Sequence, residues 1–154
     1  MDQEPIILAS DHAGFEMKQH VAQILSAREI PFHDEGALTL DSDDDYPLRI
    51  AAAAKKVSRG EFSRGIVMCG AGIGASIVAN KFRGVRAALC VTPQMAELSR
   101  RHNDANVLVL GGRITSFEDA EKIIDTWCNT PFEGGRHLRR INQIDGIPHS
   151  GDPS

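Results

Sequence analysis

The sequence has few cysteines, no excess of basic residues and no long hydrophobic run, and each absence excludes a class of protein. Its three cysteines are widely spaced and form no Cys-x-x-Cys pair, which argues against a disulfide framework or a zinc site. A net charge of −4 excludes a general nucleic-acid binder, because such proteins need a basic excess to displace counterions. No apolar stretch approaches the length of a transmembrane helix. We therefore expect a globular protein with reduced thiols, located in the cytoplasm.

Short apolar runs alternate along the chain with segments in which apolar residues recur at helical spacing. The expected strands cover residues 6–10, 31–34, 65–68, 86–90 and 106–110, and the expected helices cover residues 15–27, 47–57, 75–82, 93–103, 116–127 and 136–144. Because the strands are continuously apolar, they predict a five-stranded parallel sheet with helices on both faces and a C-terminal helix, a single Rossmann-like three-layer α/β domain. We take residues 1–145 as this domain and residues 146–154 as a flexible tail.

The most informative segment is a glycine loop that joins an apolar strand to a helix. The strand ends at Cys69, and four backbone N–H groups that follow can surround an anion; they belong to Gly70, Ala71, Gly72 and Gly74. The start of a helix favours negative charge, so we expect this field to favour the thiolate of Cys69, the form that acts as a base or nucleophile. A free cysteine is more often a small core residue, and we keep that interpretation for Cys90 and Cys128.

The glycine loop also fits the loose dinucleotide pattern G-x-G-x-x-A at Gly70–Ala75, but its context is wrong. It follows the third expected strand, and no acidic residue lies where a ribose hydroxyl needs one. Lys81 lies too far along the helix for a phosphate-binding loop. The acidic stretch Asp41–Asp45 has no EF-hand spacing. We expect a site for a phosphate or an oxyanion, with no cofactor and no metal.

Parallel sheets bind ligands at the carboxyl ends of their strands, and in the flavodoxin-like order the site lies between strands one and three. Asp11 and His12 follow the first strand and Cys69 ends the third, so these side chains should converge. Asp11 can equally cap the following helix.

A basic cluster near the C-terminus, which includes Arg136 and Arg140, is either a solvated helix face or a phosphate clamp. Arg113, which follows the fifth strand, would lie on the same rim. Taken alone, His102 and Asn103 are typical of a turn.

Seven motifs occur together in the chain. They are Asp11-His12-Ala13-Gly14, Asp45-Tyr46-Pro47, Cys69-Gly70-x-Gly-x-Gly, Ala79-Asn80-Lys81, Gly84-Val85-Arg86-Ala87-Ala88, Arg101-His102-Asn103-Asp104-Ala105-Asn106 and Gly134-Gly135-Arg136-His137. In this order they resemble the ribose-5-phosphate isomerase B family, which also includes galactose-6-phosphate and allose-6-phosphate isomerases. The resemblance implies a homodimer with active sites shared between subunits, and a metal-free aldose–ketose isomerisation through a cis-enediolate. It implies ribose 5-phosphate as the lead substrate, in the pentose phosphate pathway.

The resemblance also implies roles for single residues. Cys69 resembles the base that carries a proton between C1 and C2, and the backbone of residues 70–74 resembles an oxyanion hole for the enediolate. His102 with Asp11 resembles the pair that opens the sugar ring. The phosphate ligands implied are His12, Arg113 and the partner subunit's Arg136 and Arg140, while Tyr46 and Asn103 match positions that line the sugar.

Three positions depart from the family pattern. Ala71 stands where a Ser or Thr hydroxyl is usual, Ala75 stands where some members carry a Glu base, and Leu48 replaces a frequent acid. Ala71 keeps two alternatives open, an isomerase of a hexose or deoxy-sugar 6-phosphate and a non-catalytic module that binds sugar phosphates. A redox-sensing thiol protein is a third alternative, although no resolving cysteine lies near Cys69 in sequence.

Overall fold

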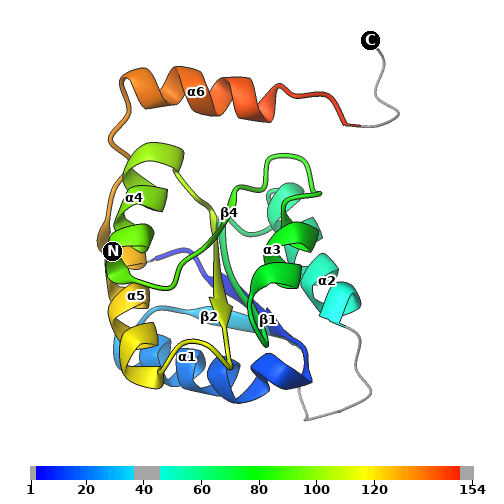
Figure 1. Ribbon diagram of the computed structural model, residues 1–154, viewed down its shortest axis with the longest axis vertical. Coiled ribbons are helices and arrows are strands. Elements are labelled where there is room, and N and C mark those ends of the chain that lie inside the picture. The colour runs from blue at the N-terminus through cyan, green and yellow to red at the C-terminus, as the bar shows by residue number, and fades with distance from the viewer. Residues whose placement is uncertain (1–2, 37–45, 150–154) are drawn as a thin grey trace.

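The apolar runs pair into one five-stranded parallel sheet in the computed structural model, which describes residues 3–36 and 46–149 (Figure 1). The strands are β1 (Ile6–Ser10), β2 (Phe32–Gly36), β3 (Arg64–Cys69), β4 (Ala87–Leu89) and β5 (Val107–Gly111). Their order is β2-β1-β3-β5-β4, so β1 and β3 are neighbours and β4 is an edge strand. The expected α/β class is confirmed, and the order differs from that of flavodoxin only in the exchange of the last two strands.

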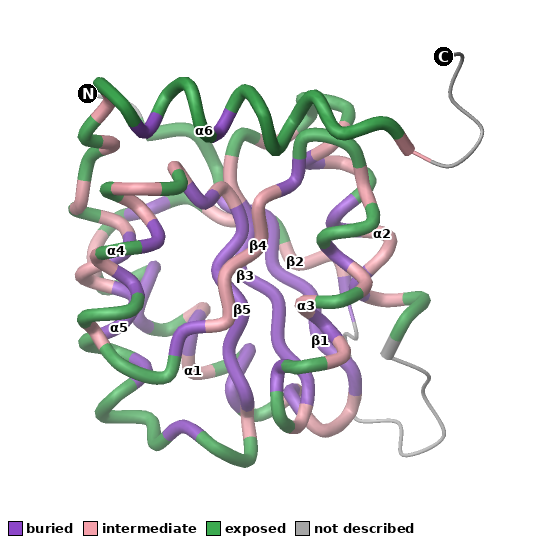
Figure 2. The backbone as a smooth tube through the Cα atoms, turned by 45° about the horizontal axis from the view of Figure 1, so that its top comes forward, coloured by how far each residue is buried: buried purple, intermediate pink, exposed green. Residues whose placement is uncertain are grey.

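Helices cover both faces of the sheet, as expected. They are α1 (Phe15–Ala27), α2 (Tyr46–Ser58), α3 (Ile73–Ala79), α4 (Pro93–Asn103), α5 (Phe117–Asn129) and α6 (Arg136–Asp145), with a short 3-10 helix, η1 (His12–Gly14), before α1. One core lies under α1, α4 and α5 and includes Leu8 and Trp127, and the other lies under α2 and α3 and includes Ile7 and Val67. Figure 2 shows the largely buried strands β1, β3 and β5 between these layers, with α6 largely exposed across one end.

Local signals set most helix boundaries, and tertiary contacts set the rest. The hydroxyl of Ser116 accepts a hydrogen bond from the Asp119 N–H and begins α5, as the capping pattern predicts. Helix α3 ends at Ala79 instead of residue 82, because the side chain of Asn80 donates to the Ala87 carbonyl and accepts from its N–H. Across the described part of the chain, no helix has both the length and the apolarity of a membrane span.

A buried ion pair joins α1 to β2. Lys18 is 1% exposed, and its Nζ lies 2.7 and 2.8 Å from the two carboxylate oxygens of Asp34. The Asp34 carboxylate also accepts a hydrogen bond from the Gly36 N–H, so it fixes the end of β2. A buried ammonium needs such a partner, because the interior does not solvate charge.

We expect Asp34→Ala to lower the free energy of unfolding by about 2–3 kcal/mol, because it leaves the Lys18 ammonium buried without this carboxylate. Urea denaturation measures the change. The matched control is Glu118→Ala, which breaks an exposed pair with Lys122 and should cost less than about 0.5 kcal/mol. Equal costs for the two variants would contradict this account.

Candidate active site

Asp11 and Cys69 lie side by side at the carboxyl ends of β1 and β3. Ser10 pairs in register with Met68, so Asp11 comes next to Cys69 across strands about 4.8 Å apart. Side chains alternate along a strand, so Asp11 and Cys69 face the α2/α3 side with Ala9 and Val67. Both residues are 5% exposed. The predicted convergence of a carboxylate and a thiol is therefore present.

The glycine loop after Cys69 is tied to the loop that follows β5. The Gly112 N–H donates to the Cys69 carbonyl, and the Arg113 N–H donates to the Gly70 carbonyl, each at 2.8 Å. Gly72 has a φ of 80°, and a Cβ there would lie 2.5 Å from Leu89 Cδ1, so only glycine fits. The loop is thereby held in one conformation at the start of α3.

His12 and Arg113 flank this loop. The Arg113 side chain lies over Gly70: its Cδ and Nη1 would lie 3.6 and 3.7 Å from a Cβ built there, and Ala13 Cβ would lie at 3.5 Å. His12 Nδ1 is buried and has no hydrogen-bond partner among the described residues. An unsatisfied ring nitrogen and a guanidinium that flank one glycine loop suit a phosphate group.

Asp11 also serves as a cap, as the structural alternative predicted. Its Oδ1 accepts a hydrogen bond of 2.9 Å from the Gly14 N–H at the start of η1. A carboxylate has a second oxygen, so capping orients the group and leaves an acceptor for chemistry.

The remaining predicted residues lie at the other end of the sheet within this chain. His102 and Asn103 end α4, and the Asn103 carbonyl accepts from Nε of Arg86, just before β4 begins. Helix α6 carries Arg136 and Arg140 and crosses this same end, opposite η1 (Figure 1). A strand the length of β3 spans about 16 Å. Within one chain, therefore, none of the four residues His102, Asn103, Arg136 and Arg140 reaches Cys69.

Tyr46 begins α2, but its side chain lies outside the described residues.

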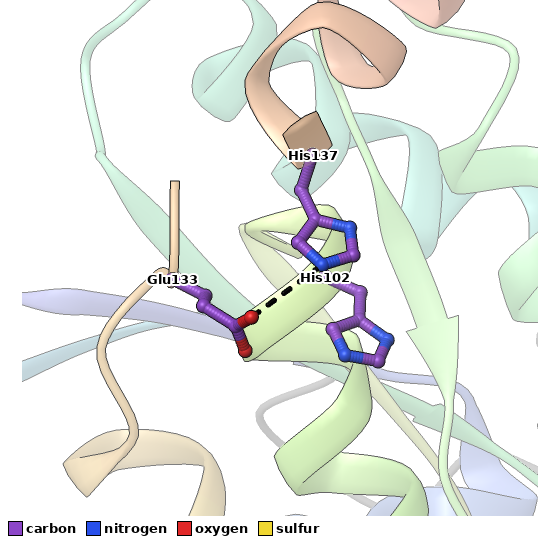
Figure 3. A group of neighbouring side chains, drawn as sticks. All are labelled: His102, Glu133 and His137. Carbon is purple, nitrogen blue, oxygen red and sulfur yellow. Dashed lines mark ion pairs between the residues drawn. The ribbon is translucent and has the colours of Figure 1, made fainter. Parts of the chain in front are cut away.

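At that far end, His102 is packed against a second histidine that was not predicted for the site. The rings of His102 and His137 are stacked, with centroids 4.3 Å apart and planes 14° from parallel. Glu133 Oε1 lies 3.7 Å from His137 Nε2 (Figure 3), and Arg101 holds Glu133 Oε2 at 3.0 Å. Burial and the nearby His102 lower the pKa of His137. The long sequence separation gives no signal of this contact, so His137 and Glu133 are absent from the predicted residues.

Among the described residues, these three side chains are a group that could hold a metal ion, since their ligand atoms lie within 4.8 Å of one another. Nearly parallel imidazoles, however, direct their in-plane lone pairs side by side and do not converge on one point. The Glu133 carboxylate is also engaged by Arg101. The geometry therefore fits a ring stack better than a formed metal site.

The other two thiols suit a packing role. All three cysteines are unpaired. Burial raises the pKa of Cys90 to about 11, and burial also raises the pKa of Cys128. Cys90 belongs to the core under α4 and α5 and Cys128 packs against it, and both stay protonated at neutral pH.

Comparison with known proteins identifies the family. Residues 6–144 match the sequence model described as Ribose/Galactose Isomerase. The chain belongs to the ribose/galactose isomerase family. It is 42% identical over 142 residues to ribose-5-phosphate isomerase B of Escherichia coli strain K12, which covers 92% of this chain and 95% of that protein.

Solved structures of the family share its fold. A ribose 5-phosphate isomerase from Thermotoga maritima has a TM-score of 0.90 and 46% identity, covering 94% of this chain and 99% of that one. Ribose-5-phosphate isomerase B from Mycoplasma genitalium with bound ribulose 5-phosphate has a TM-score of 0.88 and 39% identity, covering 92% and 93%. The expected family resemblance is thus confirmed.

Proposed function

We propose that this family member interconverts ribose 5-phosphate and ribulose 5-phosphate. The observation that carries the proposal is the Cys69 thiol beside the Asp11 carboxylate, at a glycine loop flanked by His12 and Arg113. Relatives at 42% and 46% identity over almost the whole chain are ribose-5-phosphate isomerases, which supports the same substrate here. The unpaired cysteines fit a cytoplasmic enzyme.

The proposed reaction begins with opening of the furanose ring. Asp11 accepts the proton of the C1 hydroxyl, and His102 donates a proton to the ring oxygen as the C1–O4 bond breaks. The products of this step are an aldehyde at C1 and a free hydroxyl at C4. The phosphate is held by His12 and Arg113, which lie beside the loop.

Isomerisation follows at C1 and C2. The Cys69 thiolate removes the proton from C2, and the electron pair moves into a cis-enediolate whose oxygens face the loop N–H groups. Cys69 then returns the proton to C1, which leaves the ketone at C2. A proton must also move from O2 to O1. Ala71 has no hydroxyl that could carry this proton, so we assign the transfer to a water molecule.

A second copy of the chain completes this site in the proposal. In one chain His102, Asn103, Arg136 and Arg140 lie at the opposite end of the sheet from Cys69, so they reach the sugar only from a partner subunit. A two-fold dimer supplies them reciprocally, with two sites. Apolar side chains exposed on α3 and α6, including Ile77 and Ile144, suit such a contact.

Turnover of ribose 5-phosphate tests the proposal. The purified protein, without added metal, should form ketose at an ordinary enzymatic rate, measured against a panel of hexose 6-phosphates. A higher kcat/KM on a hexose 6-phosphate than on ribose 5-phosphate would change the proposed substrate but leave the proposed isomerisation mechanism in place. Binding without turnover of any member of the panel would favour the sugar-phosphate-binding module, and Ala71 is the residue that makes this outcome informative.

A further inference from the structure

His102 has one face covered by His137 in a contact that no step above uses. Figure 3 shows the two imidazoles stacked where the end of α4 meets the start of α6. His137 is 4% exposed, whereas His102 is only half-buried. The more fixed ring therefore supports the more accessible one.

The supporting ring is itself anchored to α4. The Glu133 N–H donates to the Arg101 carbonyl at 3.1 Å, and Arg101 holds the Glu133 carboxylate through two nitrogens at 3.0 and 3.1 Å. Arg101 in turn pairs with Glu97 one turn earlier in α4. The segment that leads into α6 is thus docked on the last turn of α4, the turn that carries His102.

A histidine on a helix end has two rotatable side-chain bonds, and stacking against a fixed ring restricts both. Proton transfer to a ring oxygen depends strongly on the direction of the donor N–H. We propose that His137 is a positioning residue that holds the His102 imidazole in the orientation required for opening the sugar ring. This inference rests on the function proposed above.

The charge of His137 fits this role. Burial, with a further contribution from His102, lowers the pKa of His137, which favours the neutral form of its ring. A neutral neighbour lets His102 carry a proton without like-charge repulsion across the stack. His137 Nε2 makes no hydrogen bond among the described residues, so the ring serves through its flat face.

The test uses a chemical difference between substrate and product. Ribose 5-phosphate closes to a furanose, whereas ribulose 5-phosphate stays open because the hydroxyl needed for a five-membered ring is esterified. Exchange of the C1 hydrogen of ribulose 5-phosphate with D2O therefore measures the proton transfer by Cys69 without any ring opening. We expect His137→Ala to lower kcat on ribose 5-phosphate about 10- to 100-fold, with KM and the exchange rate within about threefold of wild type.

A second variant and a matched control complete the design. His137→Phe keeps a flat ring and loses no hydrogen bond, so it should restore most of kcat. His20→Ala removes another stacked imidazole, 4.2 Å from the Phe117 ring, which no proposed step uses, and should leave kcat unchanged.

Three results would overturn the positioning role. They are a wild-type kcat in His137→Ala, a failure of His137→Phe to restore kcat, and an equal loss of turnover and exchange, which would indicate a general disturbance of α6. Wild-type protein that forms no ketose at all, yet binds the sugar phosphate, would instead overturn the proposed function together with this inference.

Discussion

Replacing Cys69 with alanine should reduce kcat on ribose 5-phosphate by about 10³- to 10⁴-fold while leaving its affinity within about threefold. The thiol is the group to which we assign the proton transfer between C1 and C2, since Ala71 and Ala75 offer no polar group. The phosphate contacts proposed for His12 and Arg113 are untouched. Initial rates of ketose formation and calorimetric binding of ribose 5-phosphate measure the two quantities.

Cys90→Ala is the control for loss of a thiol. Cys90 lies in the core under α4, and burial keeps its pKa near 11, so its removal affects packing and leaves kcat unchanged. A Cys69→Ala enzyme that turns over within tenfold of wild type would exclude the thiol as the base. Water or another group would then have to carry the proton.

Two inactive variants should restore one another when mixed. In a shared-site dimer, Cys69→Ala and His102→Ala disable the same site from different chains. A mixed dimer therefore has one site that lacks both groups and one site that is native. Random reassociation makes half of the dimers mixed, so we expect about one quarter of wild-type activity from two nearly inactive preparations.

To check this expectation, equal amounts of the two variants are mixed, unfolded and refolded together. Activity and sedimentation are then measured on the same sample. The control mixes Cys69→Ala with Asp11→Ala, because both residues lie at the same end of one chain and the native site is never rebuilt. Recovery in the control, or full activity in a monomeric fraction, would contradict the shared site.

The sheet and one half of the site were predictable because they depend on local pattern. Apolar runs and helical spacing predict β1 and α1 with their observed bounds, Ile6–Ser10 and Phe15–Ala27. Parallel strands end at the same edge, so the convergence of Asp11 and Cys69 follows from strand order alone.

The other half depends on contacts that no spacing encodes. The stack of His137 on His102 forms because α6 folds back over the end of α4, and the early end of α3 results from bonds between Asn80 and Ala87. Helical periodicity places Lys18 on the buried face of α1. The pairing of β1 with β2 brings Asp34 to its ammonium, and this ion pair, which stabilises the buried charge, cannot be read from the spacing.

The length of the sheet also bears on how such a chain changes its substrate. In the proposed dimer, residues 69–74 and residues 136–140 contact one sugar phosphate, yet within each chain they lie at opposite ends of the sheet, where a strand the length of β3 spans about 16 Å. Substitutions that far apart, with no shared packing, affect stability nearly additively. Selection can therefore reshape the α6 end, where Arg136 and Arg140 lie, for a longer sugar while the thiol end keeps its geometry, with no compensating change in the core between them.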